Sequence, residues 1–210
     1  MYAPPLFDLT DAATIRGIIR AHSFATLVTT GEDGAPYVTH LPMIHVEDGS
    51  TNGHLLAHVA RANPHWKLFG KAPTVAIFGG AHAYISPSWY KSDDMVPTWN
   101  YQTVHVHGTP TVVADDNAAL EVVVKLSAVF EGSLPKPWTI DKMTPGKALG
   151  MMRGIVAFTM PVARFEAKSK IGQNRTVDDQ RGAAEALLAL GGADNVAVGE
   201  LMREAAKARG

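Results

Sequence analysis

The residues best suited to bind a ligand lie where a predicted strand runs into Arg61-Ala62-Asn63-Pro64. Residues 54–59 have strand composition, and Asn63 followed by Pro64 is typical of a helix N-cap and a first helical residue. A helix start exposes unpaired N–H groups, and the guanidinium of Arg61 beside them suits a phosphate. An exposed arginine next to an ordinary cap has the same pattern, so the residues alone leave both interpretations open.

Two further segments carry side chains that an anionic, hydrogen-bonding ligand could use. Residues 168–175 contain three cations and two amides, although a solvated loop can have the same composition. Residues 97–101 place two large aromatic side chains and an amide at the start of a long predicted strand, where core packing is the alternative. Neither segment identifies a ligand by itself.

His105 and His107 are two residues apart on a predicted strand and therefore project from one face, as metal ligands can. Alternate polar positions on a sheet give the same spacing, and neither cysteine nor an HExxH motif accompanies the pair. We therefore predict no metal site. No carboxylate pair has a spacing that indicates acid–base catalysis, so the catalytic residues are left unassigned.

Composition and charge exclude several classes of protein. The 210 residues include no cysteine, so disulfides and a catalytic thiol are excluded. The net charge of −1 leaves DNA binding possible but does not support it, because DNA-binding domains usually carry a basic excess. The sequence has no GxGxxG or GxxxxGK(S/T) motif, no leader-like N-terminus and no apolar run approaching about 20 residues. We expect a cytoplasmic protein without a membrane span.

The predicted elements that position these residues are mostly strands. Residues 24–30 and 36–46 have strand composition, and Gly31-Glu-Asp-Gly34 between them predicts a hairpin. Further strands are expected over 54–59, 74–78, 83–86, from 99 towards 113, and over 155–165; helices are expected over 10–22, 115–131 and near 145–152.

The pattern predicts a mainly β fold with helices, of the α+β class, whose strand order and β-rich first half suggest an antiparallel barrel. We assign residues 1–176, including the N-terminal helix, to one domain. Residues 177–210 are rich in Ala and Leu and contain two helical patterns separated by Gly191-Gly192, so we assign them to a C-terminal helical extension.

Six segments, taken in order, resemble the PaiB-type FMN-binding negative transcriptional regulator family. Any one of them is weak, but their combination and order are specific, and the resemblance extends to about residue 182. The segments are MYxPxxF at 1–7, THLP at 39–42, AHxARANPHW at 57–66, FGGAHAYISPSWY at 78–90, VPTWNYxxVHxHG at 96–108 and KxGQNR at 170–175.

The resemblance implies a split β-barrel like that of the flavin-reductase and pyridoxamine-phosphate-oxidase group, with FMN bound at the interface of a homodimer. It implies that Thr39, His40, Ala57 and His58 border the isoalloxazine, largely through backbone groups, and that Arg61 and Asn63 hold the phosphate. The residues expected to complete the cleft, some of them from the partner subunit, are Trp99, Asn100, Gln102, Gln173, Asn174 and Arg175.

The family name implies negative transcriptional regulation, yet the sequence shows no helix-turn-helix with a basic recognition face. A second hypothesis is a flavin-dependent oxidoreductase without direct DNA binding, since flavins supply redox chemistry and the cleft only has to position a substrate. Whether the chain is an enzyme is left open. A third hypothesis is haem binding or degradation, with His82, His105 or His107 as an axial ligand.

Overall fold

The computed structural model describes residues 1–144 and 146–210, which form two compact units. The first unit consists of Met1–Ile18, Gly79–Val104 and Glu166–Gly210. The second unit consists of Ile19–Phe78 and His105–Phe165. Each unit therefore combines segments that are distant in the sequence.

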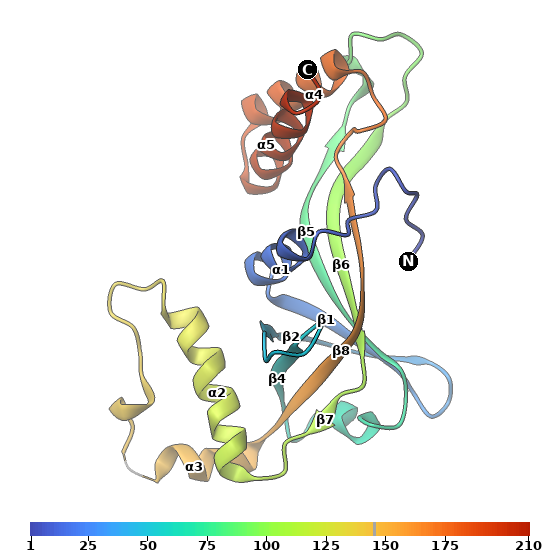
Figure 1. The fold of residues 1–210 in the computed structure, drawn as a ribbon. Helices are drawn as coiled ribbons and strands as arrows, with labels where there is room; N and C mark the ends of the chain where they lie inside the picture. Colours follow the sequence, from blue (N-terminus) through green and yellow to red (C-terminus); the bar gives the residue numbers. More distant parts are fainter. Residues whose placement is uncertain (145) are drawn as a thin grey trace. The chain divides into compact units, whose positions relative to one another are not determined.

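Eight strands form the sheet (Figure 1). They are β1 (Phe24–Thr30), β2 (Pro36–Pro42), β3 (Ile44–Val46), β4 (His54–Ala60), β5 (Thr74–Ile85), β6 (Thr98–Gly108), β7 (Thr111–Val112) and β8 (Ile155–Lys170). Their order is β2-β1-β5-β6-β8-β4-β3, and β7 pairs with β8. The pairings of β1 with β2 and β5, and of β4 with β3 and β8, are antiparallel. Strands β5, β6 and β8 contribute residues to both units.

Among the residues that the structure describes, five α-helices and four short 3-10 helices complete the fold. The α-helices are α1 (Ala12–Ala21), α2 (Asp116–Glu131), α3 (Lys147–Met151), α4 (Val177–Leu190) and α5 (Ala193–Lys207); the 3-10 helices are η1 (Pro64–Leu68), η2 (Pro87–Trp89), η3 (Ile140–Lys142) and η4 (Met152–Gly154). Within residues 1–144 and 146–210, no helix has both the length and the apolar character needed to cross a membrane.

Helix α2 covers part of the sheet in the second unit. The carboxylate of Asp115 accepts a hydrogen bond from Ala118 N at 2.8 Å and so caps the helix, as the sequence predicts. The apolar face of α2 packs on β3, β4 and β8; this cluster contains Ala119, Val122, Leu126, Ile44, Leu56 and Ala157. On the other side of the same unit, β2 contacts β4, so the sheet of this unit curls back towards itself.

Helices α4 and α5 pack together in the first unit and cover one face of β5 (Figure 1). Ala81, Ala83 and Ile85 alternate along β5 and all point into this core. The residues that meet them from the C-terminal segment are Ile171, Ala183, Ala184, Leu187, Val198 and Met202. The small side chains on β5 let the helices approach the strand closely, because alanine projects only a methyl group from the sheet.

A buried carboxylate fixes the loop that precedes β6. Asp179, at the start of α4, accepts hydrogen bonds from Lys91 N at 2.8 Å, Ser92 N at 2.9 Å and Ser92 Oγ at 2.7 Å. Burial opposes ionisation, but the bonds from Ser92, Thr176 and Lys91 outweigh it and lower the pKa of Asp179 to about 2. The loop is thereby tied to the C-terminal helices.

The structure corrects two of the predicted strand boundaries. Residues 74–78 and 83–86 are expected as separate strands, but residues 74–85 form the single strand β5, and Ser86 is the N-cap of η2. A Cβ at Gly80 would lie 3.0 Å from Gln102 Cβ, so this glycine permits a close approach to β6 rather than a turn. The strand expected over residues 36–46 divides at Met43 into β2 and β3. Of the helix expected near 145–152, residue 145 lies outside the described residues, and α3 covers 147–151.

Candidate functional site

Arg61 follows β4 and is held by backbone atoms of the second unit. Its Nε donates to the carbonyl oxygen of Arg153 at 2.8 Å, and its Nη2 donates to that of Ile155 at 2.7 Å. Its own carbonyl accepts from Trp66 Nε1 at 3.1 Å. The residue is exposed, and Nη1 makes no hydrogen bond to any residue that the structure describes. Arg61 thus presents a fixed positive charge, and both N–H groups of Nη1 and one of Nη2 remain available to a ligand.

Asn63 is the N-cap of η1, as the sequence predicts, and Pro64 is its first residue. The Oδ1 atom accepts from His65 N at 3.0 Å and from the Tyr37 hydroxyl at 3.4 Å, while Nδ2 donates to Thr39 Oγ1 at 3.1 Å. Both ends of the amide are therefore used within the protein. The helix has only five residues, so the positive charge near a phosphate here has to come mainly from Arg61.

A chain of buried hydrogen bonds continues from Asn63 through the second unit. Thr39 Oγ1 lies 2.8 Å from His65 Nδ1, and His65 Nε2 lies 2.9 Å from Thr29 Oγ1. Thr29 Oγ1 lies 2.8 Å from Thr74 Oγ1. The chain connects η1 to β2, β1 and β5. The sequence analysis did not find it, because its threonines lie on three strands and their spacing along the sequence carries no signal.

The imidazole of His65 is fully buried. Its ring lies between those of Tyr37 and Phe69, with centroid distances of 4.7 Å and 5.5 Å. Burial lowers the pKa of His65 to about 4, so the ring is neutral near pH 7. A neutral imidazole has one donor and one acceptor nitrogen, and both are used here.

Thr39 and His40 point to opposite faces of β2, because side chains alternate along a strand. Thr39 joins the chain at Asn63 and His65, whereas His40 is exposed and its Nδ1 lies 3.0 Å from Thr26 Oγ1 on β1. Only Thr39 is brought together with the Arg61 segment through its side chain. His40 can border a ligand on that side only through its backbone.

Ala57 and His58 alternate in the same way on β4. Ala57 is fully buried in the core of the second unit, whereas the side chain of His58 is only half-buried. The Nδ1 atom of His58 is buried and has no hydrogen-bond partner among the described residues, and burial lowers the pKa of this ring. Such an atom lacks compensation for its lost hydration, so it fits a ligand that supplies the missing hydrogen bond.

The predicted residues on β6, which belong to the first unit, do not all lie on one face of the strand. Trp99 is 53% exposed, whereas Asn100 is 1% exposed and its Nδ2 donates to Met202 Sδ at 3.2 Å. Asn100 therefore points into the core beneath α5. Gln102 is half-buried and donates to Ser169 Oγ at 3.1 Å. A single ligand cannot contact the side chains of both Trp99 and Asn100 on one face of the strand.

The segment after β8 forms a turn held by its own amides. Gln173 Nε2 donates to Ser169 O at 2.6 Å, and Gln173 Oε1 accepts from Ile171 N at 2.8 Å. Gln102 and Gln173 are thus brought together at Ser169. Asn174 is exposed, and Arg175 stacks on Tyr90 at 5.3 Å.

The first unit also contains two lysines to which the sequence analysis gave no separate role. Lys168 is buried, and its Nζ lies 5.3–5.9 Å from the ring centroids of Tyr2, Phe7 and Tyr101. This contact explains the N-terminal MYxPxxF segment, which packs its aromatic rings around a cation. Lys170 donates to Trp99 O at 2.7 Å, and its pKa is lowered by burial and by the charges of Lys168 and Arg175. The three cations therefore lie close enough to one another for their charges to interact.

Residues 1–164 match the model of a protein family described as "Putative FMN-binding domain". The chain belongs to this family. It is also 37% identical over 188 residues to "Protease synthase and sporulation protein PAI 2" of Bacillus subtilis, a match that covers 89% of each chain. These findings confirm the resemblance to the PaiB family. The matched region includes every predicted site residue up to Gln102, whereas Gln173, Asn174 and Arg175 lie beyond it.

Two solved structures show the same fold at low sequence identity. The FAD and haem binding protein of Mycobacterium smegmatis has a TM-score of 0.61 and 17% identity, covering 79% of this chain and 74% of its own. The flavocytochrome Anf3 of Azotobacter vinelandii has the same TM-score and identity, covering 79% and 70%. The predicted antiparallel split β-barrel with helices is confirmed. At this identity the likeness concerns the fold alone.

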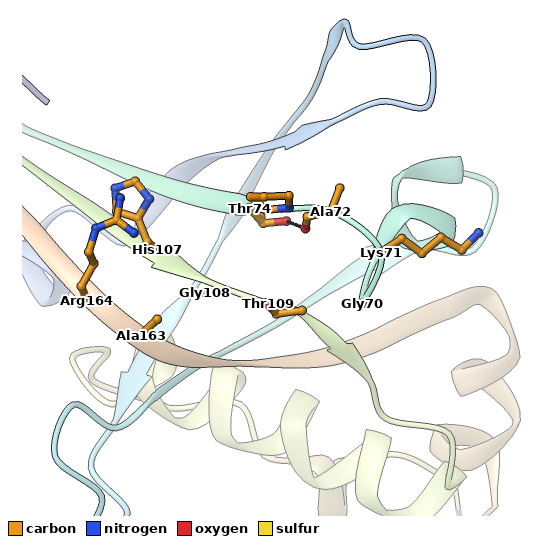
Figure 2. Close-up of a pocket in the computed structure, with 10 residues that line it drawn as sticks. Gly70, Lys71, Ala72, Thr74, His107, Gly108, Thr109, Ala163 and Arg164 are labelled. Atoms are coloured by element: carbon orange, nitrogen blue, oxygen red, sulfur yellow. Dashed lines mark hydrogen bonds between the residues drawn. The ribbon is translucent and has the colours of Figure 1, made fainter.

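A separate hollow of about 370 Å³ opens on the second unit (Figure 2). Figure 2 shows Lys71 at one end of it and Arg164 with His107 at the other. Its lining is Gly70, Lys71, Ala72, Pro73, Thr74, His107, Gly108, Thr109, Ala163 and Arg164, which includes no carboxylate. No residue of the predicted flavin site lines this hollow, although Thr74 also ends the chain of buried hydrogen bonds.

The low pKa of His65 predicts that the protein loses stability in mild acid. Between pH 6.5 and about 4 the unfolded chain binds a proton at this residue and the folded chain does not, so the free energy of unfolding falls as the pH falls through this range. We expect a loss of about 2 kcal/mol between pH 7 and pH 5 in urea unfolding. His65→Gln should make the loss smaller, with the remainder from His58. An equal loss in both proteins would contradict the assignment.

Proposed function

We propose that this protein binds FMN through a phosphate site at Arg61. The observation that carries the proposal is the match to an FMN-binding family over a region in which Arg61 is exposed, fixed by two carbonyl groups and left with a free Nη1. Asn63 shapes the same segment as the cap of η1. A guanidinium held in this way suits a phosphate, because it forms a charge-assisted hydrogen bond without first having to be ordered.

The isoalloxazine would be bordered by Thr39, His40, Ala57 and His58. The unpartnered Nδ1 of His58 supports this, since a flavin ring carries several nitrogen and oxygen atoms that can complete its hydrogen bonding. Ala57 and His40 would contribute backbone groups, as their side chains point away from Thr39 or into the core. A bound flavin supplies one- and two-electron redox chemistry, and the residues named here bind and orient it.

We also propose that the protein is a homodimer in which the partner completes the flavin cleft. Each unit leaves large apolar side chains on its surface: Tyr84 is 45% exposed and Trp99 is 53% exposed on the first, and Phe24 is 70% exposed on the second. Groups of exposed apolar side chains often mark protein interfaces. Trp99, Gln102, Asn174 and Arg175 would reach the flavin of the other subunit from the first unit.

The biological role that we propose first is negative transcriptional regulation by the FMN-loaded dimer, as the family resemblance implies. The net charge of −1 favours action through a partner over direct contact with DNA. The second role is flavin-dependent oxidoreduction, which the exposed Trp99 beside three cations would support by offering a surface for an anionic, aromatic substrate.

Two measurements separate these roles. Anaerobic stopped-flow mixing of the FMN-loaded protein with NADH or NADPH detects reductase activity as bleaching of the flavin, and an unchanged spectrum excludes it for these donors. Gel-shift assays on upstream DNA at physiological salt detect direct regulation. A shift there would show that the dimer contacts DNA itself in spite of its charge.

Arg61→Ala should weaken FMN binding by about 1–3 kcal/mol, or about 5- to 150-fold in Kd, because the phosphate loses charge-assisted hydrogen bonding. Binding is measured by the quenching of flavin fluorescence, and thermal unfolding checks that the variant is folded. Lys71→Ala is the matched control, since Lys71 is also an exposed cation near η1 and should leave the affinity unchanged. Equal affinities of the Arg61 variant and the original protein would refute the phosphate site.

The dimer predicts a mass in solution of twice 22.5 kDa by light scattering. Trp99→Glu should shift the protein towards the monomer and weaken FMN binding, because a carboxylate would be buried at the interface. Leu190→Glu places the same charge at a residue of similar exposure on α4 and should leave the dimer intact. A monomer at micromolar concentration of the original protein would refute the proposal.

A further inference from the structure

We infer that His65 is a positioning residue for the flavin phosphate site, through a chain of hydrogen bonds whose direction follows from its end at β5. The inference rests on the proposed function of Arg61. His65 itself is fully buried, so it does not touch the ligand. Its effect would reach the site through Asn63 and the short helix η1.

The direction of the chain follows from its end at β5. The hydroxyl of Thr74 donates to Ala72 O at 3.3 Å, and a carbonyl oxygen can only accept. The single proton of Thr74 is then used, so Thr29 must donate to Thr74 across 2.8 Å. Thr29 in turn must accept from His65 Nε2. The neutral ring therefore carries its proton on Nε2.

The same reasoning fixes the other end of the chain. With the proton on Nε2, His65 Nδ1 can only accept, so Thr39 donates to it across 2.8 Å. Thr39 then accepts from Asn63 Nδ2. This sets the amide of Asn63 with its oxygen towards His65 N, as the N-cap requires. Every member of the chain is satisfied in this arrangement.

The arrangement determines where Arg61 lies. Asn63 N donates to Ala60 O at 2.9 Å, so Asn63 closes the turn that contains Arg61. Trp66, on η1, donates to Arg61 O at 3.1 Å. A shift of η1 would strain the bond from Trp66 to the Arg61 carbonyl, while Arg61 N stays bonded to Gly154 O at 2.9 Å and the side chain stays bonded to residues 153 and 155. Helix η1 therefore holds the carbonyl side of Arg61, and residues 153–155 hold its amide and its guanidinium.

Two substitutions of His65 separate positioning from packing. In His65→Asn the amide oxygen replaces Nδ1 and can still accept from Thr39, whereas in His65→Gln the amide nitrogen replaces Nε2 and can only reach Thr29. Each removes part of the ring and leaves one threonine unpaired, so their losses of thermal stability should be similar. Only the Gln variant breaks the link to Asn63.

The experiment measures the Kd for FMN at pH 7 for the full-length variants, at a temperature where all are folded. His65→Gln should weaken binding about five- to tenfold, while His65→Asn should stay within about twofold of the original protein. Equal affinities of the Gln and Asn variants would overturn the inference.

Combining His65→Gln with Arg61→Ala in one protein distinguishes a failure of this inference from a failure of the proposed phosphate site. If His65 acts through Arg61, the Gln variant should cause no further loss of affinity in the Arg61→Ala background. If Arg61→Ala alone has no effect, the phosphate site is wrong. Hydrogen exchange of the FMN-free protein then still tests the positioning: the amides of residues 61–63 should exchange faster in His65→Gln than in His65→Asn, and equal rates would overturn it.

Discussion

The second unit depends on one buried imidazole that has to find two hydrogen-bond partners away from water. His65 meets this requirement with threonines from β1 and β2, and those threonines are satisfied in turn by β5 and by the cap of η1. A half-satisfied network would cost more than an apolar core, because each orphaned group keeps its full desolvation penalty. The strand register, the cap of η1 and the tautomer of the imidazole therefore depend on one another. The segment at Arg61 is ordered by the same hydrogen bonds, because it leads directly into η1.

The first unit is subject to a different constraint, because several of its cations lie close together and repel one another. Lys168 is surrounded by aromatic rings, Lys170 bonds to the backbone at Trp99, and Arg175 lies on Tyr90. Aromatic faces and carbonyl groups stabilise these charges without neutralising them. The carboxylate of Asp179 does not pair with these cations; it accepts hydrogen bonds from backbone N–H and hydroxyl groups. Trp99 is 53% exposed beside the carbonyl that bonds to Lys170, so an aromatic surface and a cation lie together there.

The fold could be predicted from the sequence where the signals are local. The Asn63-Pro64 cap, the Asp115 cap and the first hairpin depend on neighbouring residues and are confirmed. Strand β5 was predicted as two strands, 74–78 and 83–86, because the close approach of Gly80 to Gln102 depends on a strand about twenty residues away. The sequence indicated which segments form the candidate site, but not which side chains of those segments point towards it. His65 lay within a recognised motif without a role, and Asn100 was grouped with Trp99 although alternation along β6 separates them.

Arg61 illustrates why a binding residue and a structural residue can be the same side chain. Nε and Nη2 each donate one hydrogen bond to the carbonyl groups of residues 153 and 155, which leaves both N–H groups of Nη1 and one of Nη2 for a phosphate. One edge of the guanidinium thus holds the backbone while the other edge can form charge-assisted hydrogen bonds to a ligand. A lysine could supply the charge but could not hold the two carbonyl groups in the same geometry. The affinity for a phosphate at this site therefore depends on how firmly the backbone around Arg61 is held. Helix η1 and the buried His65 contribute to that rigidity.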